Sequence, residues 1–322
     1  MMIDIERAAE ILSGCGDVYI LTHMNPDGDT LGSAFALMRA LRSLGRRAEV
    51  KCSDRIPEKY SYMSDGLDTC EFEPDSIVAV DVATPELFGS RLEKYGGRVA
   101  LCIDHHGSNT GYAASTLLDA ASSSTCEIIF KVIKLLAPGS IDAKIASCLY
   151  TGISTDTGCF KFSNTTPESH MAAAELMQLG ADSDRINRVM FETKSRRYFE
   201  LERLAMETLE YHFDNTCAVM TITQDMFNRT GTDESDCDGL ASLPRQIEGV
   251  TVGITLREKP DGTFKASVRT HAPFNASDIC AMSGGGGHAR AAGCTLSAPI
   301  ENAKAEMLKN AKSIMESTHP DF

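Results

Sequence analysis

Residues 23–29 have the sequence His-Met-Asn-Pro-Asp-Gly-Asp, and they directly follow the apolar stretch Asp17–Thr22 (DVYILT). The apolar stretch predicts a buried β-strand, and the Pro-Asp-Gly segment predicts a turn. Beyond the turn, apolar residues recur at helical spacing from Leu31 to Leu41, and Gly45 supplies a stop. Because a strand, a polar turn and a helix in this order begin a βαβ unit, the stretch predicts an α/β fold with a parallel sheet.

The remainder of the first half repeats this alternation of strands and helices. Ser124 and Glu127 have the spacing of a helix N-terminal capping pair. Further helices are predicted over Asp142–Thr151 and from Pro167 until Gly180. Continuous apolar runs are typical of strands that are covered on both faces. Strands of this kind or with a weaker apolar pattern are predicted at residues 47–52, 77–82 and 99–103.

The second half has a different pattern. Residues 195–212 (SRRYFELERLAMETLEYH) predict a charged amphipathic helix, which either links two domains or packs on one of them. Strand patterns then mix with short helices, which indicates a smaller α+β domain. The predicted strands are 217–223, 250–258, 264–270 and 292–296, and the last helix is 300–316. We therefore predict a first domain at 1–190, a helical linker at 191–214 and a second domain at 215–322.

Composition and charge limit the classes of function. The chain has 322 residues and a formal net charge of -14. A protein this acidic lacks the general affinity for long nucleic acid that phosphate neutralisation by Lys and Arg provides, and anionic membranes repel it. Eleven cysteines without a CxxC pair, and no apolar N-terminal segment, argue against a secreted disulfide scaffold. We expect a cytoplasmic protein that does not enter a membrane.

Histidine and aspartate residues follow several of the predicted strands. Taken alone, the segment 23–29 is also compatible with an Asx-rich turn that caps the next helix. Four segments contain such residues, however, and we expect them at one edge of the sheet, beyond the carboxyl ends of its parallel strands. Ligands bind at that edge in open α/β sheets. Carboxylates and imidazoles without cysteine favour Mn²⁺ or Mg²⁺ over structural Zn²⁺, and their number suggests two ions. The residues are His23, Asp27, Asp29, Asp81, Asp104, His105, His106 and Asp156.

A glycine-rich segment near the C-terminus forms a second motif. Gly284–Gly287 expose backbone N–H groups without side chains in front of them, which allows a phosphate or a base to approach the main chain. His288 then adds a hydrogen-bond donor and Arg290 adds a cation. A flexible linker is the competing interpretation, but the sequence His-Ala-Arg-Ala-Ala-Gly that follows is unusual for a linker. The motif therefore predicts a binding loop.

The four metal-type segments HMNPDGD, VAVD, IDHH and STDTG resemble those of the DHH phosphoesterase superfamily, which is named for the triplet at Asp104–His106. GGGGHARAAG resembles the glycine-rich motif of the DHH-associated domain. The resemblance covers nearly the whole chain in the right order. Among members, the chain is most similar to the nanoRNase / pAp phosphatase group. That similarity implies a Mn²⁺-dependent hydrolase that degrades short oligoribonucleotides and removes the 3′-phosphate of 3′,5′-bisphosphoadenosine (pAp).

The resemblance also implies a role for each site residue. His23 and Asp27 would bind one Mn²⁺, and Asp29, His105 and Asp156 would bind the other, with Asp81 bridging both; Mg²⁺ is the other candidate ion. His106 would face the substrate phosphate, and Asp104 would orient its neighbours. The second domain would close over the metals and read the substrate. Its implied substrate-binding residues are Arg269, Gly285, Gly286, Gly287 and His288, although Arg269 on its own is equally compatible with an exposed strand residue.

Other functions stay open at this point. The same metal site suits cyclic di-AMP, a linear dinucleotide such as pApA or pGpG, or, with less support, polyphosphate and pyrophosphate. A non-catalytic nucleotide sensor is the alternative outside enzymes. Long single-stranded DNA would need an extended basic groove with aromatic platforms, and the chain has 7% aromatic residues and no Trp. The expected partners are thus short RNA oligonucleotides or nucleoside bisphosphates, and a homodimer is the assembly left open.

Overall fold

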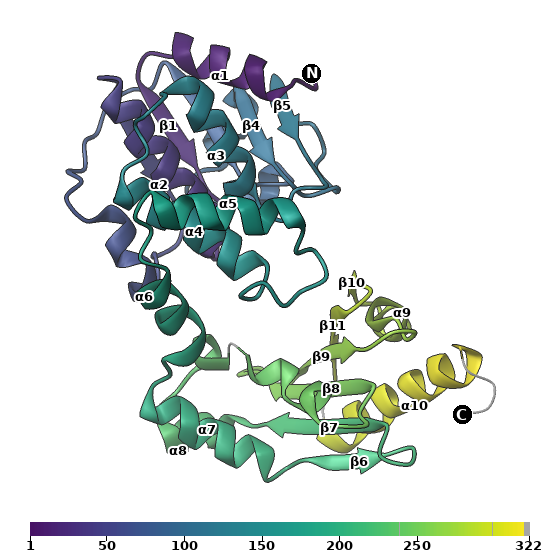
Figure 1. The fold of residues 1–322 in the computed structure, drawn as a ribbon. Helices are drawn as coiled ribbons and strands as arrows, with labels where there is room; N and C mark the ends of the chain where they lie inside the picture. Colours follow the sequence, from purple (N-terminus) through teal and green to yellow (C-terminus); the bar gives the residue numbers. More distant parts are fainter. Residues whose placement is uncertain (238, 298, 319–322) are drawn as a thin grey trace. The chain divides into compact units, whose positions relative to one another are not determined.

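The structure is a computed structural model, and it describes residues 1–237, 239–297 and 299–318 (Figure 1). The chain divides into two compact units, Met1–Thr193 and Lys194–Phe322. Each unit is built around a sheet of its own. Within the described residues, no helix combines the length and the apolar character that a membrane span requires.

A five-stranded sheet forms the centre of the first unit. The strand order is β2-β1-β3-β4-β5, and all neighbouring strands are parallel. This confirms the predicted α/β class with a parallel sheet. The strands are β1 (Val18–Leu21), β2 (Ala48–Lys51), β3 (Ser76–Val80), β4 (Leu101–Asp104) and β5 (Ser115–Leu118).

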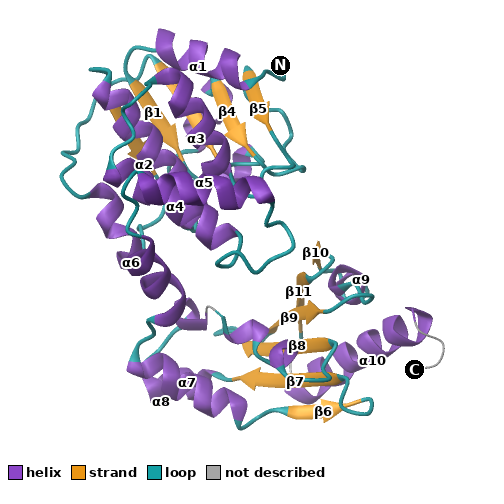
Figure 2. Cartoon of the chain, viewed as in Figure 1, coloured by secondary structure: helices purple, strands orange, loops and turns teal. Residues whose placement is uncertain are grey.

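Both faces of this sheet are covered. Val18 and Ile20 of β1 belong to the larger apolar core, whereas Tyr19 and Leu21 belong to a smaller core on the opposite face. The continuous apolar strands are explained by this double cover, because alternate side chains enter different cores. Figure 2 shows the layer of helices over the sheet. The helices are α1 (Ile5–Gly14), α2 (Gly28–Ser43), α3 (Thr125–Leu136), α4 (Ala143–Asp156), α5 (Pro167–Gln178) and α6 (Ser183–Asn187), with a π-helical turn at Arg188–Glu192 and 3₁₀ turns at Glu58–Ser64, Pro85–Phe88 and Glu93–Arg98.

The second unit contains a six-stranded mixed sheet with the order β10-β11-β9-β8-β7-β6. Only the β7–β8 pair is parallel among the pairs described. This is the predicted smaller α+β domain. Its strands are β6 (Glu210–His212), β7 (Cys217–Ile222), β8 (Val252–Glu258), β9 (Phe264–Thr270), β10 (Gly286–His288) and β11 (Ala291–Leu296). Its helices are α7 (Arg196–Met206), α8 (Gln224–Thr230), α9 (Ala276–Ala281) and α10 (Ile300–Thr318), with 3₁₀ turns at Glu234–Cys237, Leu240–Ser242 and Pro244–Gln246.

The helix predicted over residues 195–212 is wrong in its last part. Helix α7 ends at Met206, and Glu210–His212 form β6, which pairs antiparallel with the start of β7. The backbone hydrogen bonds that β6 makes with β7 outweigh the weak helical preference of Glu210–His212. The apolar side of α7, including Tyr198 and Leu201, packs against β7. Thus α7 is a packed helix of the second unit.

Two further differences concern elements near functional segments. The helix predicted at Asp142–Thr151 continues to Asp156, and within it Thr151 and Thr155 donate their hydroxyl groups to backbone carbonyls one turn earlier. Asp156 therefore lies at a helix end, where a loop position was expected. The short strands β5, β6 and β10 were not predicted, since each has only three or four residues and a mixed polar pattern.

Candidate metal centre

The carboxyl edge of the first sheet brings the predicted residues together. Asp81 directly follows β3, and Asp104 is the last residue of β4, so His105 and His106 begin the next loop. Two helix ends supply the others. Asp27 is the N-cap of α2, Asp29 lies in its first turn, and Asp156 is the last residue of α4. His23 lies between β1 and α2. The ends of strands β1, β3 and β4 and the ends of helices α2 and α4 therefore bring together residues up to 133 positions apart.

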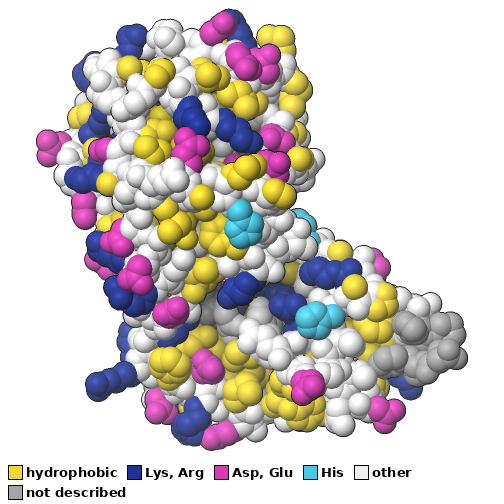
Figure 3. All heavy atoms as spheres, viewed as in Figure 1, with side chains coloured by type: hydrophobic (Ala, Val, Ile, Leu, Met, Phe, Trp, Pro, Cys, Tyr) yellow, Lys and Arg dark blue, Asp and Glu magenta, His cyan; other side chains and the backbone are white. Residues whose placement is uncertain are grey.

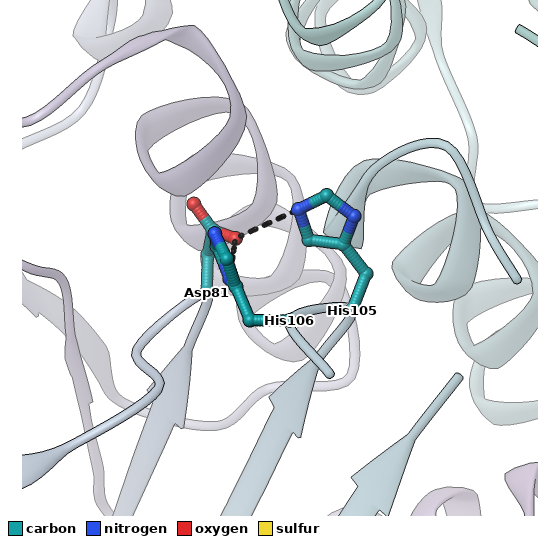
Figure 4. A group of neighbouring side chains, drawn as sticks. All are labelled: Asp81, His105 and His106. Atoms are coloured by element: carbon teal, nitrogen blue, oxygen red, sulfur yellow. Dashed lines mark ion pairs between the residues drawn. The ribbon is translucent and has the colours of Figure 1, made fainter. Parts of the chain in front are cut away.

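Asp81 lies at the middle of this cluster. Its Oδ2 is 3.6 Å from His23 Nε2, and its Oδ1 is 3.7 Å from His105 Nε2. Figure 4 shows the imidazoles of His105 and His106 both approaching this carboxylate from the loop after β4. Among the described residues, the potential ligand atoms form three groups, each within 4.8 Å, and Asp81 belongs to two of them. The groups are His23–Asp27–Asp81, Asp29–His105–Asp156 and Asp81–His105–His106.

The backbone of Asp81 is unusual for a residue other than glycine. Its φ is +60°, in the left-handed region that Asn and Asp tolerate best. Its N–H donates to the carbonyl of Ile103 at 2.9 Å, and Thr125 Oγ1 donates to its Oδ1 at 2.9 Å. Only 2% of Asp81 is exposed. A buried residue in a left-handed conformation at a strand end is typical of a functional position.

Asp29 is fully buried and is held by the start of another helix. Its oxygens accept the N–H groups of Thr125 at 2.7 Å and Cys126 at 2.8 Å, in the first turn of α3. The positive end of a helix stabilises a carboxylate. Burial nevertheless raises the pKa of Asp29 well above its usual range, and repulsion from Asp81 and Asp156 adds to the rise. The site thus forces an acidic group into a place that disfavours its charge.

The pKa values of neighbouring groups show the same conflict. Burial, followed by repulsion from Asp81 and Asp27, raises the pKa of Asp156 to about 8. Burial alone would lower the pKa of His23, but hydrogen bonds to Asp27 and Asp81 outweigh it and raise this pKa to about 11. Without a cation, the crowded carboxylates are balanced by protons. A divalent cation replaces such protons, so this set of oxygen and imidazole donors fits Mn²⁺ or Mg²⁺.

His106 has a different environment from His105. Its Nδ1 lies 2.8 Å from Asp104 Oδ1, and the same oxygen accepts the backbone N–H groups of His105 and His106. Asn109 Nδ2 donates to the other oxygen of Asp104 at 2.6 Å. Burial would raise the pKa of Asp104, but hydrogen bonds with His106 and Asn109 outweigh it and lower this pKa. Asp104 therefore fixes the loop that carries both histidines.

The predicted substrate residues belong to the second unit. Arg269 lies on β9, and Gly286, Gly287 and His288 form the exposed edge strand β10. Glycine is required at Gly287, where φ is +147° and a Cβ would lie 2.7 Å from the carbonyl oxygen of Ala291. A Cβ at Gly285 would lie 2.3 Å from the carbonyl oxygen of Gly293. The motif is therefore an ordered hairpin, and the linker interpretation is wrong.

Comparison with known proteins agrees with the fold and the motifs. Residues 17–153 match the model of the DHH family, N-terminal domain, and residues 214–317 match that of the DHHA1 domain. The chain is 35% identical to the bifunctional oligoribonuclease and PAP phosphatase NrnA of Thermus thermophilus. The aligned region covers 89% of this chain and 87% of that protein. The chain belongs to the DHH family.

More distant relatives have names that indicate other activities. The cyclic-di-AMP phosphodiesterase PdeA of Listeria monocytogenes is 26% identical over 87% of this chain, which spans 44% of that protein. Among solved structures, an exopolyphosphatase-related protein from Bacteroides fragilis aligns with a TM-score of 0.87 at 24% identity, covering 96% of this chain and 95% of the other. RecJ from Thermus thermophilus in complex with Mn²⁺ aligns with a TM-score of 0.56 at 17% identity, and the alignment covers 96% of this chain and 55% of RecJ. These two structures support the DHH fold.

Some contacts of this DHH site were not predicted. Thr125 and Asn109 hold Asp81 and Asp104, respectively, and neither residue was assigned a role from the sequence. The helix start at Ser124 was the available signal for Thr125, because the first turn of a helix presents free N–H groups. Which carboxylate those groups would meet depends on tertiary contacts. Asn109 lies close after the DHH triplet, but spacing alone did not indicate a role.

Proposed function

We propose that the chain is a metal-dependent phosphoesterase that hydrolyses short oligoribonucleotides to mononucleotides and removes the 3′-phosphate of pAp. The observation that carries this proposal is the cluster of three aspartates and three histidines around the buried carboxylate of Asp81. The 35% identity to an oligoribonuclease and PAP phosphatase favours these substrates. The second unit of this chain matches the DHHA1 domain and contains the glycine hairpin, which supports a nucleotide-binding role.

We assign the metal ligands as two overlapping sets. His23, Asp27 and Asp81 would hold one divalent cation, and Asp29, His105, Asp156 and Asp81 would hold the other. Mn²⁺ is the proposed ion, with Mg²⁺ as the second candidate, since carboxylate and imidazole donors suit both. Two such ions activate water and stabilise the charge that develops on phosphoryl oxygens.

The residues of the chain would position the substrate around this centre. The Nδ1 of His106 contacts Asp104, so its Nε2, for which the described residues provide no hydrogen bond, would face a phosphate oxygen. Arg269, the glycines of β10 and His288 would contact the nucleotide. His106 would act as donor or acid toward the phosphate, and Asp104 would act through His106 and the loop backbone.

A second candidate function is hydrolysis of cyclic di-AMP or of the linear dinucleotides pApA and pGpG. The similarity to a cyclic-di-AMP phosphodiesterase over 87% of this chain favours it. A substrate panel separates the two functions: pAp, RNA of two to five nucleotides, pApA, pGpG, cyclic di-AMP and pyrophosphate, each with Mn²⁺ and with Mg²⁺. We expect the highest kcat/KM for pAp or the shortest RNA. Turnover of cyclic di-AMP alone would favour the second function, and nucleotide binding without turnover would indicate a sensor.

A further inference from the structure

The sheet of the second unit has one polar face near the glycine hairpin. Along β9, Phe264, Ala266 and Val268 are buried in the core, so Lys265, Ser267 and Arg269 point to the other face. Across the strands, Arg269 lies opposite Ala291 of β11 and opposite Gly253 of β8. Ala291 in turn lies opposite His288. Arg269 is therefore flanked by two small residues in one row with His288.

A second arginine occupies the space above Gly253. A Cβ on Gly253 would lie 2.6 Å from the backbone nitrogen of Arg245 and 3.1 Å from its Cα. Since Val252 and Ile254 point into the core, this Cβ direction is the polar face. Arg245 thus lies one strand away from Arg269 on the same face. Figure 3 shows Lys and Arg side chains together with a histidine over this part of the second unit.

Neither guanidinium group is neutralised by the described residues. Arg245 Nε is buried and has no hydrogen-bond partner there. The hydrogen bond described for the Arg269 guanidinium is the one that Nη1 donates to the neighbouring carbonyl of Val268, at 3.1 Å. Burial and repulsion by Arg245 lower the pKa of Arg269. By contrast, Arg257 on the same face is paired with Glu234. Arg245 and Arg269 are therefore two neighbouring, partly buried cations, and Arg245 has an unsatisfied hydrogen-bond donor. A bound anion would compensate both charges and accept that hydrogen bond.

We propose that Arg245 and Arg269 together bind a terminal phosphate monoester of the nucleotide substrate. Two guanidinium groups match the charge of about -2 on a phosphomonoester, whereas a phosphodiester linkage within RNA carries a single charge. This inference rests on the proposed function and narrows it. The preferred substrates carry a terminal phosphate besides the one that is hydrolysed, as pAp and 5′-phosphorylated dinucleotides do. Arg245 is then a residue that determines substrate specificity.

The test compares substrates with and without the extra phosphate. kcat/KM is measured for pAp against adenosine 3′-monophosphate, and for pApA against ApA, in wild type and Arg245→Gln. The variant should lose at least tenfold on pAp and pApA, about 1.4 kcal/mol. It should change less than about twofold on the two substrates that lack the phosphate. Equal losses on all four substrates, or no loss on any, would overturn the assignment.

Two controls keep the result interpretable. Arg229→Gln removes a surface arginine that is paired with Asp225 in the same unit, and it should leave all four values unchanged. Thermal midpoints show whether Arg245→Gln folds, and Arg245→Lys supplies a milder variant that keeps the charge. If wild type turns over none of these substrates, the proposed function fails. The affinity for pAp is then measured by calorimetry in EDTA, for wild type and for Arg245→Gln. At least tenfold weaker binding to the variant supports phosphate binding by the two arginines, and equal binding overturns it.

Discussion

Asp104 and His106 form a hydrogen-bonded pair, with 2.8 Å between Oδ1 and Nδ1. The same carboxylate accepts two backbone N–H groups and the amide of Asn109, so it is surrounded by donors. An amide in its place would turn its own N–H groups toward some of these donors. The pair therefore links the geometry of His106, which we propose to face the substrate, to that of its neighbour His105.

Asp104→Asn should lower kcat/KM for pAp by about 10- to 100-fold, the usual effect of losing a partner that orients ligands. The reason is misorientation of His105 and His106, so Mn²⁺ affinity should also fall. Both quantities can be measured by steady-state assays and calorimetry. Asp184→Asn, at an exposed acid of the same unit, is the matched control. Unchanged kinetics in Asp104→Asn would show that the pair has no positioning role.

Gly152 of α4 should tolerate no side chain. A Cβ there would lie 2.2 Å from Cys126 Sγ and 2.6 Å from Asp29 Oδ1, so Gly152→Ala must displace a proposed metal ligand. We expect a destabilisation of about 1–3 kcal/mol from overpacking and a loss of Mn²⁺-induced stabilisation. Differential scanning fluorimetry with and without Mn²⁺ measures both. Gly14→Ala in α1 meets no atom within 4 Å and should be neutral or slightly stabilising. Equal behaviour of the two variants would argue against this packing.

Asp156→Asn should separate stability from metal binding. In metal-free protein the pKa of Asp156 is about 8, against 3.8 for the ordinary group. The folded chain therefore keeps a proton that the unfolded chain loses, and this stabilisation is present below about pH 4 and is lost as the pH rises to about 8. Because an amide does not titrate, the variant should become more stable than wild type as the pH rises.

This effect is measured as the difference in thermal midpoint between Asp156→Asn and wild type in EDTA, at pH 5 and at pH 9. A change of 1 kcal/mol in the free energy of unfolding shifts the thermal midpoint by about 2–4 °C for units of this size. The midpoint difference should grow in favour of the variant toward pH 9, while added Mn²⁺ should stabilise only wild type. A difference that does not change with pH would contradict the assigned pKa.

The parallel sheet and the convergence of polar residues could be predicted from the sequence. The runs at 77–82 and 99–103 are apolar on both faces, which is the pattern expected of a strand that packs between two cores. β5 and β6 could not be predicted, because short edge strands depend on the neighbour they pair with. The homodimer and the division of roles between units stay predictions.

The support around the ligands could not be predicted either. Thr125 contacts both Asp29 and Asp81, which are 96 and 44 positions away in the chain. Only the packing of α3 against the sheet edge creates these contacts. Arg245 lies in a 3₁₀ turn without a recognisable motif, and its proximity to Arg269 follows from the glycine at Gly253. Residue types predicted the chemistry, and tertiary packing determined which residues orient it.

The catalytic role of the metal centre around Asp81 is tested by measuring hydrolysis of pAp and an RNA dinucleotide by wild type and Asp81→Asn at saturating Mn²⁺. Asn keeps the left-handed backbone that Asp81 adopts, so the substitution removes the charge with little strain. We expect Mn²⁺-dependent release of phosphate and mononucleotides by wild type, and at least about a 100-fold lower kcat in a folded Asp81→Asn variant. Equal turnover by the two proteins would contradict it.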